Sequence, residues 1–139
     1  MGRKSLKGIR QKEIVEAFYK VARREGLEHA SLAKVAGEMG INRSLGSHYF
    51  GSKNALIFGL IEFILASYKN FYTLDYGEPE YGSRLRNIIE NLFSREWDKL
   101  IDDEVFYDCF TLVFRNENIK TAYKELHEHL RKWLTEAIE

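Results

Sequence analysis

Hydrophobic residues recur with the 3.6-residue period of an amphipathic α-helix along most of this 139-residue chain. The first apolar stripe consists of Ile14, Ala17, Phe18, Val21 and Ala22. Gly26 follows it as a plausible left-handed stop, and the segment 75–79 contains the single proline and is typical of a loop. The alternation expected of a β-strand is almost absent. The pattern therefore predicts an all-α protein with no strand of three or more residues.

Capping residues predict where the next helices begin and end. Ser31 is a good N-cap for a short second helix, which Gly40 ends. Asn42 caps a third short helix, and Ser52 caps a long fourth helix over about 53–71. The first half of the chain is thus expected to hold four helices.

The fourth helix has apolar residues on two sides. One stripe runs through Leu56, Leu60, Phe63 and Ile64, and the other through Ile57, Ile61, Leu65 and Tyr68. A helix that is apolar on two sides is usually packed between two partners. No other segment has stripes suited to both parts of the chain. We therefore expect this helix to pack against residues 1–52, the head, on one side and against the rest of residues 53–139, the body, on the other, and to transmit movement between them.

Three further helices are expected after the loop, with a break at Asn116. The predicted buried positions are Leu85, Ile88, Ile89, Leu92 and Phe93 in the fifth helix; Val105, Phe106, Cys109, Phe110 and Val113 in the sixth, which begins near Asp102; and Ile119, Ala122, Tyr123, Leu126, Leu130, Trp133, Leu134 and Ala137 in the seventh.

The net charge of zero is unevenly distributed. Residues 1–56 contain eleven Lys and Arg against five Asp and Glu, a net +6, and residues 57–139 contain ten against sixteen, a net −6. This distribution favours a head that binds a polyanion and a body that binds something else.

The remaining composition narrows the class of protein. Hydrophobic residues make up 45% and charged residues 30% of the chain, which excludes a disordered tail. A single cysteine fits a reducing cytoplasm. No apolar run reaches the roughly 18 residues needed to span a bilayer, and the basic N-terminus has no secretory signal. We therefore expect a cytoplasmic protein without a membrane partner.

A helix-turn-helix is predicted at Gly40-Ile41-Asn42. The glycine permits the tight turn, Ile41 fills the gap between the two helices, and Asn42 starts the second helix. That helix has the width to enter a major groove. The alternative is a helical hairpin that serves packing, in an adaptor or small-molecule-binding module that does not bind DNA; salt-dependent DNA binding separates the two.

The residues around this turn form a longer pattern over about residues 8–60. It comprises Ser31 and Leu32, Val35-Ala36, Gly40-Ile41-Asn42, His48-Tyr49-Phe50, Ser52-Lys53 and Leu56. This pattern resembles the DNA-binding signature of the TetR family of bacterial transcriptional regulators. The form Ser47-His48-Tyr49-Phe50, followed by Lys53-Asn54, is similar to the choline-sensing betaine-operon repressors of that family.

The resemblance implies a ligand-responsive repressor. It implies a three-helix DNA-binding domain over 1–52, a helical ligand-binding and dimerisation domain over 53–139, operator DNA and a small-molecule inducer as partners, and a homodimer in the complete protein. The family usually has two more helices, which dimerise. Either the chain is truncated or the protein dimerises differently, and without those two helices the chain is expected to bind DNA weakly.

The DNA-binding residues that the turn and the resemblance indicate are Ser31, Asn42, Arg43, Ser44, Leu45, Ser47, His48, Tyr49 and Lys53. Arg43 is the best base-reading candidate, because a guanidinium pairs bidentately with guanine. Lys53 opens a helix, where its charge and free backbone N–H groups would hold a phosphate. Arg3, Lys4, Lys7 and Arg10 form a basic arm that either follows the DNA or is a solvated terminus.

Two positions depart from the family pattern. Gly46 stands where the family usually has a buried leucine or isoleucine, and Leu45 stands where a small or polar residue often faces DNA. Either the third helix is rotated slightly, or Leu45 contacts a thymine methyl group.

In the body, an aromatic-lined cavity for an apolar or cationic ligand is one interpretation and a plain core is the other. The candidate ligand residues are Phe63, Tyr68, Phe93, Trp97, Tyr107 and Phe110.

The sequence gives little support for an enzymatic function. His127 and His129 are two apart on a predicted helix and so point to different faces, which makes a poor metal pair. Cys109 lies on an apolar stripe, and Gly51-Ser52-Lys53 lacks the upstream glycines of a phosphate loop. We expect no catalytic residue, no metal and no cofactor.

Overall fold

The computed structural model describes residues 2–72 and 83–138, and all of its regular elements are helices, which confirms the predicted all-α fold. The elements are α1 (Gly2–Glu25), α2 (Leu32–Met39), α3 (Arg43–Tyr49), α4 (Lys53–Tyr72), α5 (Ser83–Leu92), α6 (Arg95–Leu100), α7 (Asp103–Thr111), the 3₁₀ helix η1 (Leu112–Phe114) and α8 (Glu117–Ile138). The predicted loop at 75–79 and the side chains of Arg3, Lys4, Leu92, Trp97 and Ala137 lie outside the described residues.

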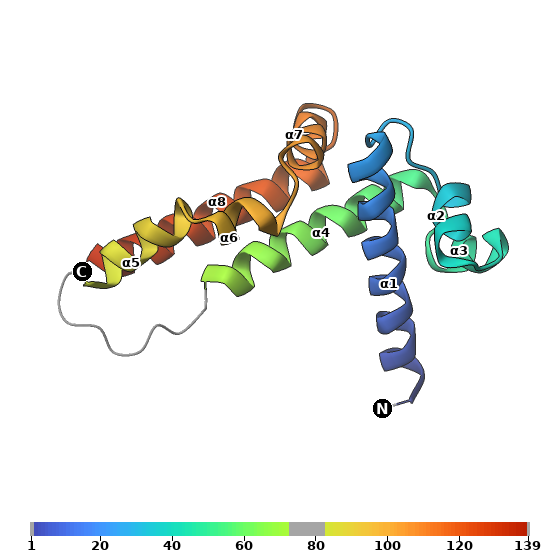
Figure 1. Cartoon of the computed structure of the whole chain (residues 1–139), viewed down its shortest axis with the longest axis horizontal. Helices are drawn as coiled ribbons and strands as arrows, with labels where there is room; N and C mark the ends of the chain where they lie inside the picture. The colour runs from blue at the N-terminus through green and yellow to red at the C-terminus, as the bar shows by residue number, and fades with distance from the viewer. Residues whose placement is uncertain (1, 73–82, 139) are drawn as a thin grey trace.

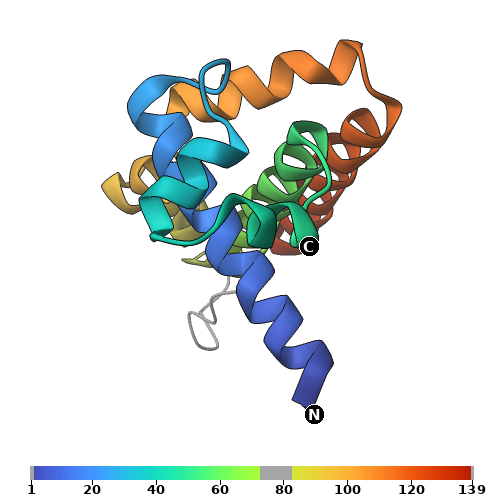
Figure 2. The ribbon, with the colours of Figure 1, turned by 90° about the vertical axis from the view of Figure 1, so that its right-hand side faces the viewer.

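The long helix α4 connects the two parts of the molecule (Figure 1). The helices α1, α2 and α3 gather around its first turns, and α8 runs alongside it in the same direction, with α5 and α7 against α8. The N-terminal half of α1 projects away from the other helices (Figure 2), and its residues Leu6 and Ile9 are exposed. The predicted basic arm is therefore the first part of a continuous helix.

Both predicted stripes of α4 face the core, as expected, although Phe63 is only half-buried. Leu56, Leu60 and Ile64 of one stripe and Ile61 of the other have no exposed surface. They belong to one apolar cluster that includes residues of the head, such as Phe18, and residues of the body. A continuous core means that α4 cannot move without disturbing contacts on both of its sides.

The crossing of α1 over α4 is close because α4 carries a glycine there. A Cβ atom added to Gly59 would lie 3.1 Å from Val15 Cγ2 on α1 and 3.1 Å from Phe50 Cε1. A larger residue would therefore require the side chains of Val15 and Phe50 to move aside.

Two predictions about the body are wrong. Ile89 and Phe93, expected in the core, have 46% and 85% of their surface exposed. The helix α5 is covered on the side of Ile88, and the apolar stripe is wider than the face that its neighbours cover. Helix α6 was not predicted, because its six residues, Arg95–Leu100, are mostly polar and too few to show a helical period.

No single helix in the described part of the chain is long and apolar enough to cross a membrane. The helix pair Arg43–Tyr49 and Lys53–Tyr68, which is bent by 65°, has the length and composition of a membrane span only when its two helices are counted together. In the fold, the apolar residues of that pair are largely buried in the protein core.

Candidate DNA-binding surface

Helices α2 and α3 form the helix-turn-helix that the sequence predicts. Gly40 ends α2 in the left-handed region, at φ 65°, which favours glycine. The Ile41 N–H donates to the Ala36 carbonyl at 3.0 Å, and the Asn42 side-chain oxygen accepts from the Ser44 N–H at 3.1 Å. The turn is thus fixed at both ends by hydrogen bonds to its own backbone.

Two of the predicted DNA-binding side chains serve as helix caps. Asn42 caps α3, and the Ser31 hydroxyl accepts from the Lys34 N–H at 3.2 Å to cap α2. Ser52 caps α4 in the same way, accepting from the Ala55 N–H at 3.1 Å. These caps set the directions in which α2, α3 and α4 leave their turns.

The rotation of α3 follows from Gly46, which is buried against α2. A Cβ atom at this position would lie 3.0 Å from Leu32 Cδ1, so Leu32 fills the space that a larger residue would need. Position 46 therefore faces inward, as in the family pattern, and Leu45 points outward with 37% of its surface exposed.

The outward face of α3 carries most of the predicted DNA-binding residues. The exposed residues at the start of α3 and along it are Asn42, Arg43, Ser44, Leu45, Ser47 and His48, and Tyr49 is half-buried. No side chain in the described part of the chain pairs with the Arg43 guanidinium, which leaves its donors available. The Ser47 hydroxyl donates to the Arg43 carbonyl at 3.1 Å, and the His48 ring packs edge-on against Tyr49, with centroids 5.3 Å apart.

Lys53 has a structural contact that the sequence did not indicate. Its Nζ donates to the Glu28 carbonyl at 2.7 Å and so ties the first turn of α4 to the turn after α1. An ammonium group has three donors. The Lys53 ammonium group can therefore make this hydrogen bond and contact a phosphate at the same time.

Ion pairs fix α2 against α1. Arg24 pairs with Glu38 at 3.1 Å, and Lys34 pairs with Glu25 at 2.9 Å. The hydrogen bond from Lys34 lowers the pKa of the Glu25 carboxyl below its ordinary value. At the exposed end of α1, Arg10 pairs with Glu13 at 2.9 Å, so part of the basic arm is neutralised within the helix.

Three of the predicted ligand residues are part of the packed interior. The Tyr68 ring packs edge-on against Phe106, with centroids 5.9 Å apart, and Phe110 packs against Tyr123, with centroids 5.4 Å apart. Phe63 packs against Tyr19 of α1. Burial raises the pKa of the Tyr68 hydroxyl to about 12. These contacts describe a core rather than an aromatic-lined cavity.

The other predicted ligand residues do not join them. Phe93 and Tyr107 have 85% and 63% of their surface exposed, and the Trp97 side chain lies outside the described residues. The five described residues are thus not gathered around one space, and the role of all six in ligand binding stays a prediction.

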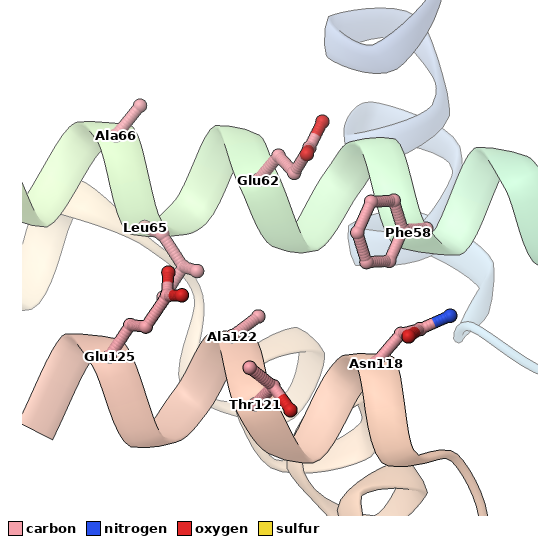
Figure 3. A pocket seen from close by; sticks show the side chains of 8 residues that line it. All are labelled: Phe58, Glu62, Leu65, Ala66, Asn118, Thr121, Ala122 and Glu125. Carbon is pink, nitrogen blue, oxygen red and sulfur yellow. The ribbon is translucent and has the colours of Figure 1, made fainter.

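A groove of about 430 Å³ lies between α4 and α8 (Figure 3). Its lining consists of Phe58, Glu62, Leu65 and Ala66 from α4 and Asn118, Thr121, Ala122 and Glu125 from α8. The two carboxylates give the groove a negative charge, and none of its eight described lining residues is basic. None of the five predicted ligand residues whose side chains the structure describes contributes to it.

No group of three or more His, Cys, Asp or Glu side chains is placed to hold a metal ion within the described residues. His127 Nδ1 lies 2.8 Å from the Tyr123 carbonyl, one turn earlier on α8. Cys109 is completely buried, and burial raises the pKa of its thiol to about 12. A neutral, inaccessible thiol is a poor nucleophile.

Comparison with known proteins gives matches in both parts of the chain. The family model described as "Tetracyclin repressor-like, C-terminal domain" matches residues 81–139. The HTH-type transcriptional regulator BetI of Yersinia pestis (strain Pestoides F) is 28% identical over 98 residues, which cover 67% of this chain and 48% of the regulator. BetI of Vibrio atlanticus (strain LGP32) is 34% identical over 67 residues, covering 48% of this chain and 34% of that protein.

The fold and the turn at 40–42 define an all-α protein of the helix-turn-helix class. Taken with the matches, they support the resemblance to the TetR family of regulators that the sequence indicates. The chain spans about half the length of the curated relatives that it matches.

Proposed function

We propose that this chain is part of a TetR-type transcriptional repressor, which binds operator DNA through α3 and responds to a small-molecule inducer. The observation that carries this proposal is the outward face of α3. Arg43, Ser44 and Ser47 are exposed on a helix that Gly46 holds against α2, and the basic charge of the chain lies in the same part of the molecule.

Each residue has a distinct role in this proposal. Arg43 reads a base, because a free guanidinium matches the two acceptors of guanine in the major groove. Leu45 offers an apolar contact to a thymine methyl group. Asn42 and Ser31 act by holding the turn, and Lys53 contributes charge toward a phosphate.

The inducer would act on the body. We place it in the groove between α4 and α8, where it would contact Phe58 and Glu62 of α4 directly. Because α4 also packs on the head, a shift of α4 would change the position of α3. Inducer and DNA would then bind antagonistically, to the extent that the inducer prefers one arrangement of α4 over the other.

The remaining parts of the proposal follow the family. The complete protein would be a cytoplasmic, non-enzymatic homodimer, whose two α3 helices reach successive major grooves about 34–36 Å apart. A single chain offers one α3 helix and therefore binds one half-site.

The experiment that tests the proposal is selection of bound sequences from a random DNA pool, followed by affinity measurement with variants. Arg43→Ala should lose preference at one base pair, by about 1–3 kcal/mol. Arg115→Ala is the matched control, since it removes the same charge from an exposed position in the body. If no sequence is enriched, or if both variants behave alike, the proposed role of α3 is wrong.

A further inference from the structure

A second contact joins the head to the body, between α1 and the start of α7. The Tyr19 hydroxyl accepts a hydrogen bond from the Asp102 backbone N–H at 2.8 Å, and Arg23 Nε lies 3.8 Å from Asp102 Oδ2. The two partners of the hydrogen bond are 83 residues apart in sequence. We call Tyr19, Arg23 and Asp102 the α1–α7 junction.

The junction lies at the capped and buried start of α7. Asp102 is the N-cap of α7, and its Oδ1 accepts from the Val105 N–H at 3.2 Å. Ile101 and Val105 on either side are 2% and 1% exposed. A rigid helix start transfers a displacement of α1 to the rest of α7, because buried neighbours leave no space to absorb it.

The junction is also connected to the helix-turn-helix. The residue after Arg23 in sequence, Arg24, pairs with Glu38 of α2, and the Tyr19 ring packs against Phe63 of α4 at 6.2 Å. Neighbouring residues of α1 therefore hold the body on one side and α2 on the other. The continuous set of contacts runs from α7 through α1 to α2, which packs on α3.

We propose that the α1–α7 junction is a second structural connection between head and body, which couples DNA binding by α3 to the stability of α7 in addition to the contacts of α4. The part of this inference that concerns DNA rests on the proposed function. It replaces the expectation that α4 alone transmits movement between the two parts.

Hydrogen exchange of the Val105 and Phe106 amides, with and without a duplex from the selection experiment, tests the coupling. These amides donate within α7, to Asp102 Oδ1 and to the Asp102 carbonyl, so removing the Tyr19 hydroxyl does not break their bonds directly. In the unmodified chain, bound DNA should slow their exchange by about fivefold or more, the lower end of typical coupling between two sites.

Tyr19→Phe should lose most of this slowing while the variant still binds DNA, and Arg23→Gln should reduce it. Tyr123→Phe is the matched control, because the Tyr123 hydroxyl donates to the Phe106 carbonyl at 3.4 Å from within the body. That variant should keep the DNA-dependent slowing. Full slowing in Tyr19→Phe, or none in the unmodified chain with DNA bound, would overturn the proposal.

If no duplex binds, the proposed repressor function fails, and the junction is tested without DNA. Gly40→Ala strains the turn of the head, where φ is 65°. Through the junction, this strain should speed exchange at Val105 and Phe106, and Tyr19→Phe should abolish the effect. Unchanged exchange in Gly40→Ala alone, or an equal increase in both backgrounds, contradicts the coupling.

Discussion

Gly46→Ala tests the packing that sets the rotation of α3. Alanine is favoured over glycine in a helix interior by about 1 kcal/mol. The new Cβ would lie 3.0 Å from Leu32 Cδ1 and 3.5 Å from Leu32 Cγ, whereas carbon atoms pack best at about 3.5–4.0 Å. Leu32 packs against the core, so part of the overlap has to be relieved by moving α3.

Overpacking of this kind costs about 1–3 kcal/mol. With about 2 kcal/mol for the overlap against about 1 kcal/mol of helix propensity, Gly46→Ala should destabilise the protein by about 1 kcal/mol. In a Leu32→Ala background the overlap is absent, and the same substitution should stabilise by about 1 kcal/mol. The expected coupling is therefore about 2 kcal/mol.

Urea unfolding of the four proteins of this double-mutant cycle, followed by circular dichroism, measures the coupling. The two single variants, the double variant and the unmodified chain are compared under one buffer condition. If Gly46→Ala changes the free energy of unfolding equally in both backgrounds, then Leu32 does not restrict the space at position 46. The inferred rotation of α3 then loses its support.

Three further predictions concern single residues and their contacts in the fold. Burial raises the pKa of Cys109 to about 12, so on raising the pH the thiol ionises first in the unfolded chain, near pH 9. The free energy of unfolding should therefore fall above pH 9, by at most about 1.4 kcal/mol per pH unit. In urea titrations, Cys109→Ala should lack this part of the decrease. Lys53→Met should lower stability by about 1 kcal/mol in thermal unfolding, because the Glu28 carbonyl loses its donor; unchanged stability would show that this hydrogen bond contributes nothing. Gly59→Ala should cost up to about 2 kcal/mol in the same assay, because about 1–3 kcal/mol of overpacking against Val15 and Phe50 is partly offset by about 1 kcal/mol of helix propensity; a more stable variant would refute the close crossing of α1 and α4.

The sequence predicts the head of this protein well, because its local signals agree with one another. Ser31, Asn42 and Ser52 cap the helices that they were expected to cap, and Gly40 adopts the left-handed conformation. The buried stripes of α4 also follow from periodicity alone. These features depend on residues close together in the chain, which is where sequence patterns carry most information.

The errors arise where distant segments meet. Periodicity shows that Ile89 and Phe93 share a face with Ile88, but not how far a neighbouring helix covers that face. The carbonyl partner of Lys53 and the contact between Tyr19 and α7 join segments 25 and 83 residues apart, and no local pattern indicates them. The aromatic residues of the body are equally compatible with a core and with a cavity until their contacts are known.

The central claim, that the exposed face of α3 binds DNA, is tested most directly by the salt dependence of affinity for the selected duplex. Each neutralised phosphate should contribute about −0.9 to the slope of log K against log salt concentration. We predict a clearly negative slope for the unmodified chain, which becomes smaller by about 1 in Lys53→Met. Absence of binding at low salt, or binding that does not change with salt, would contradict DNA recognition by this protein.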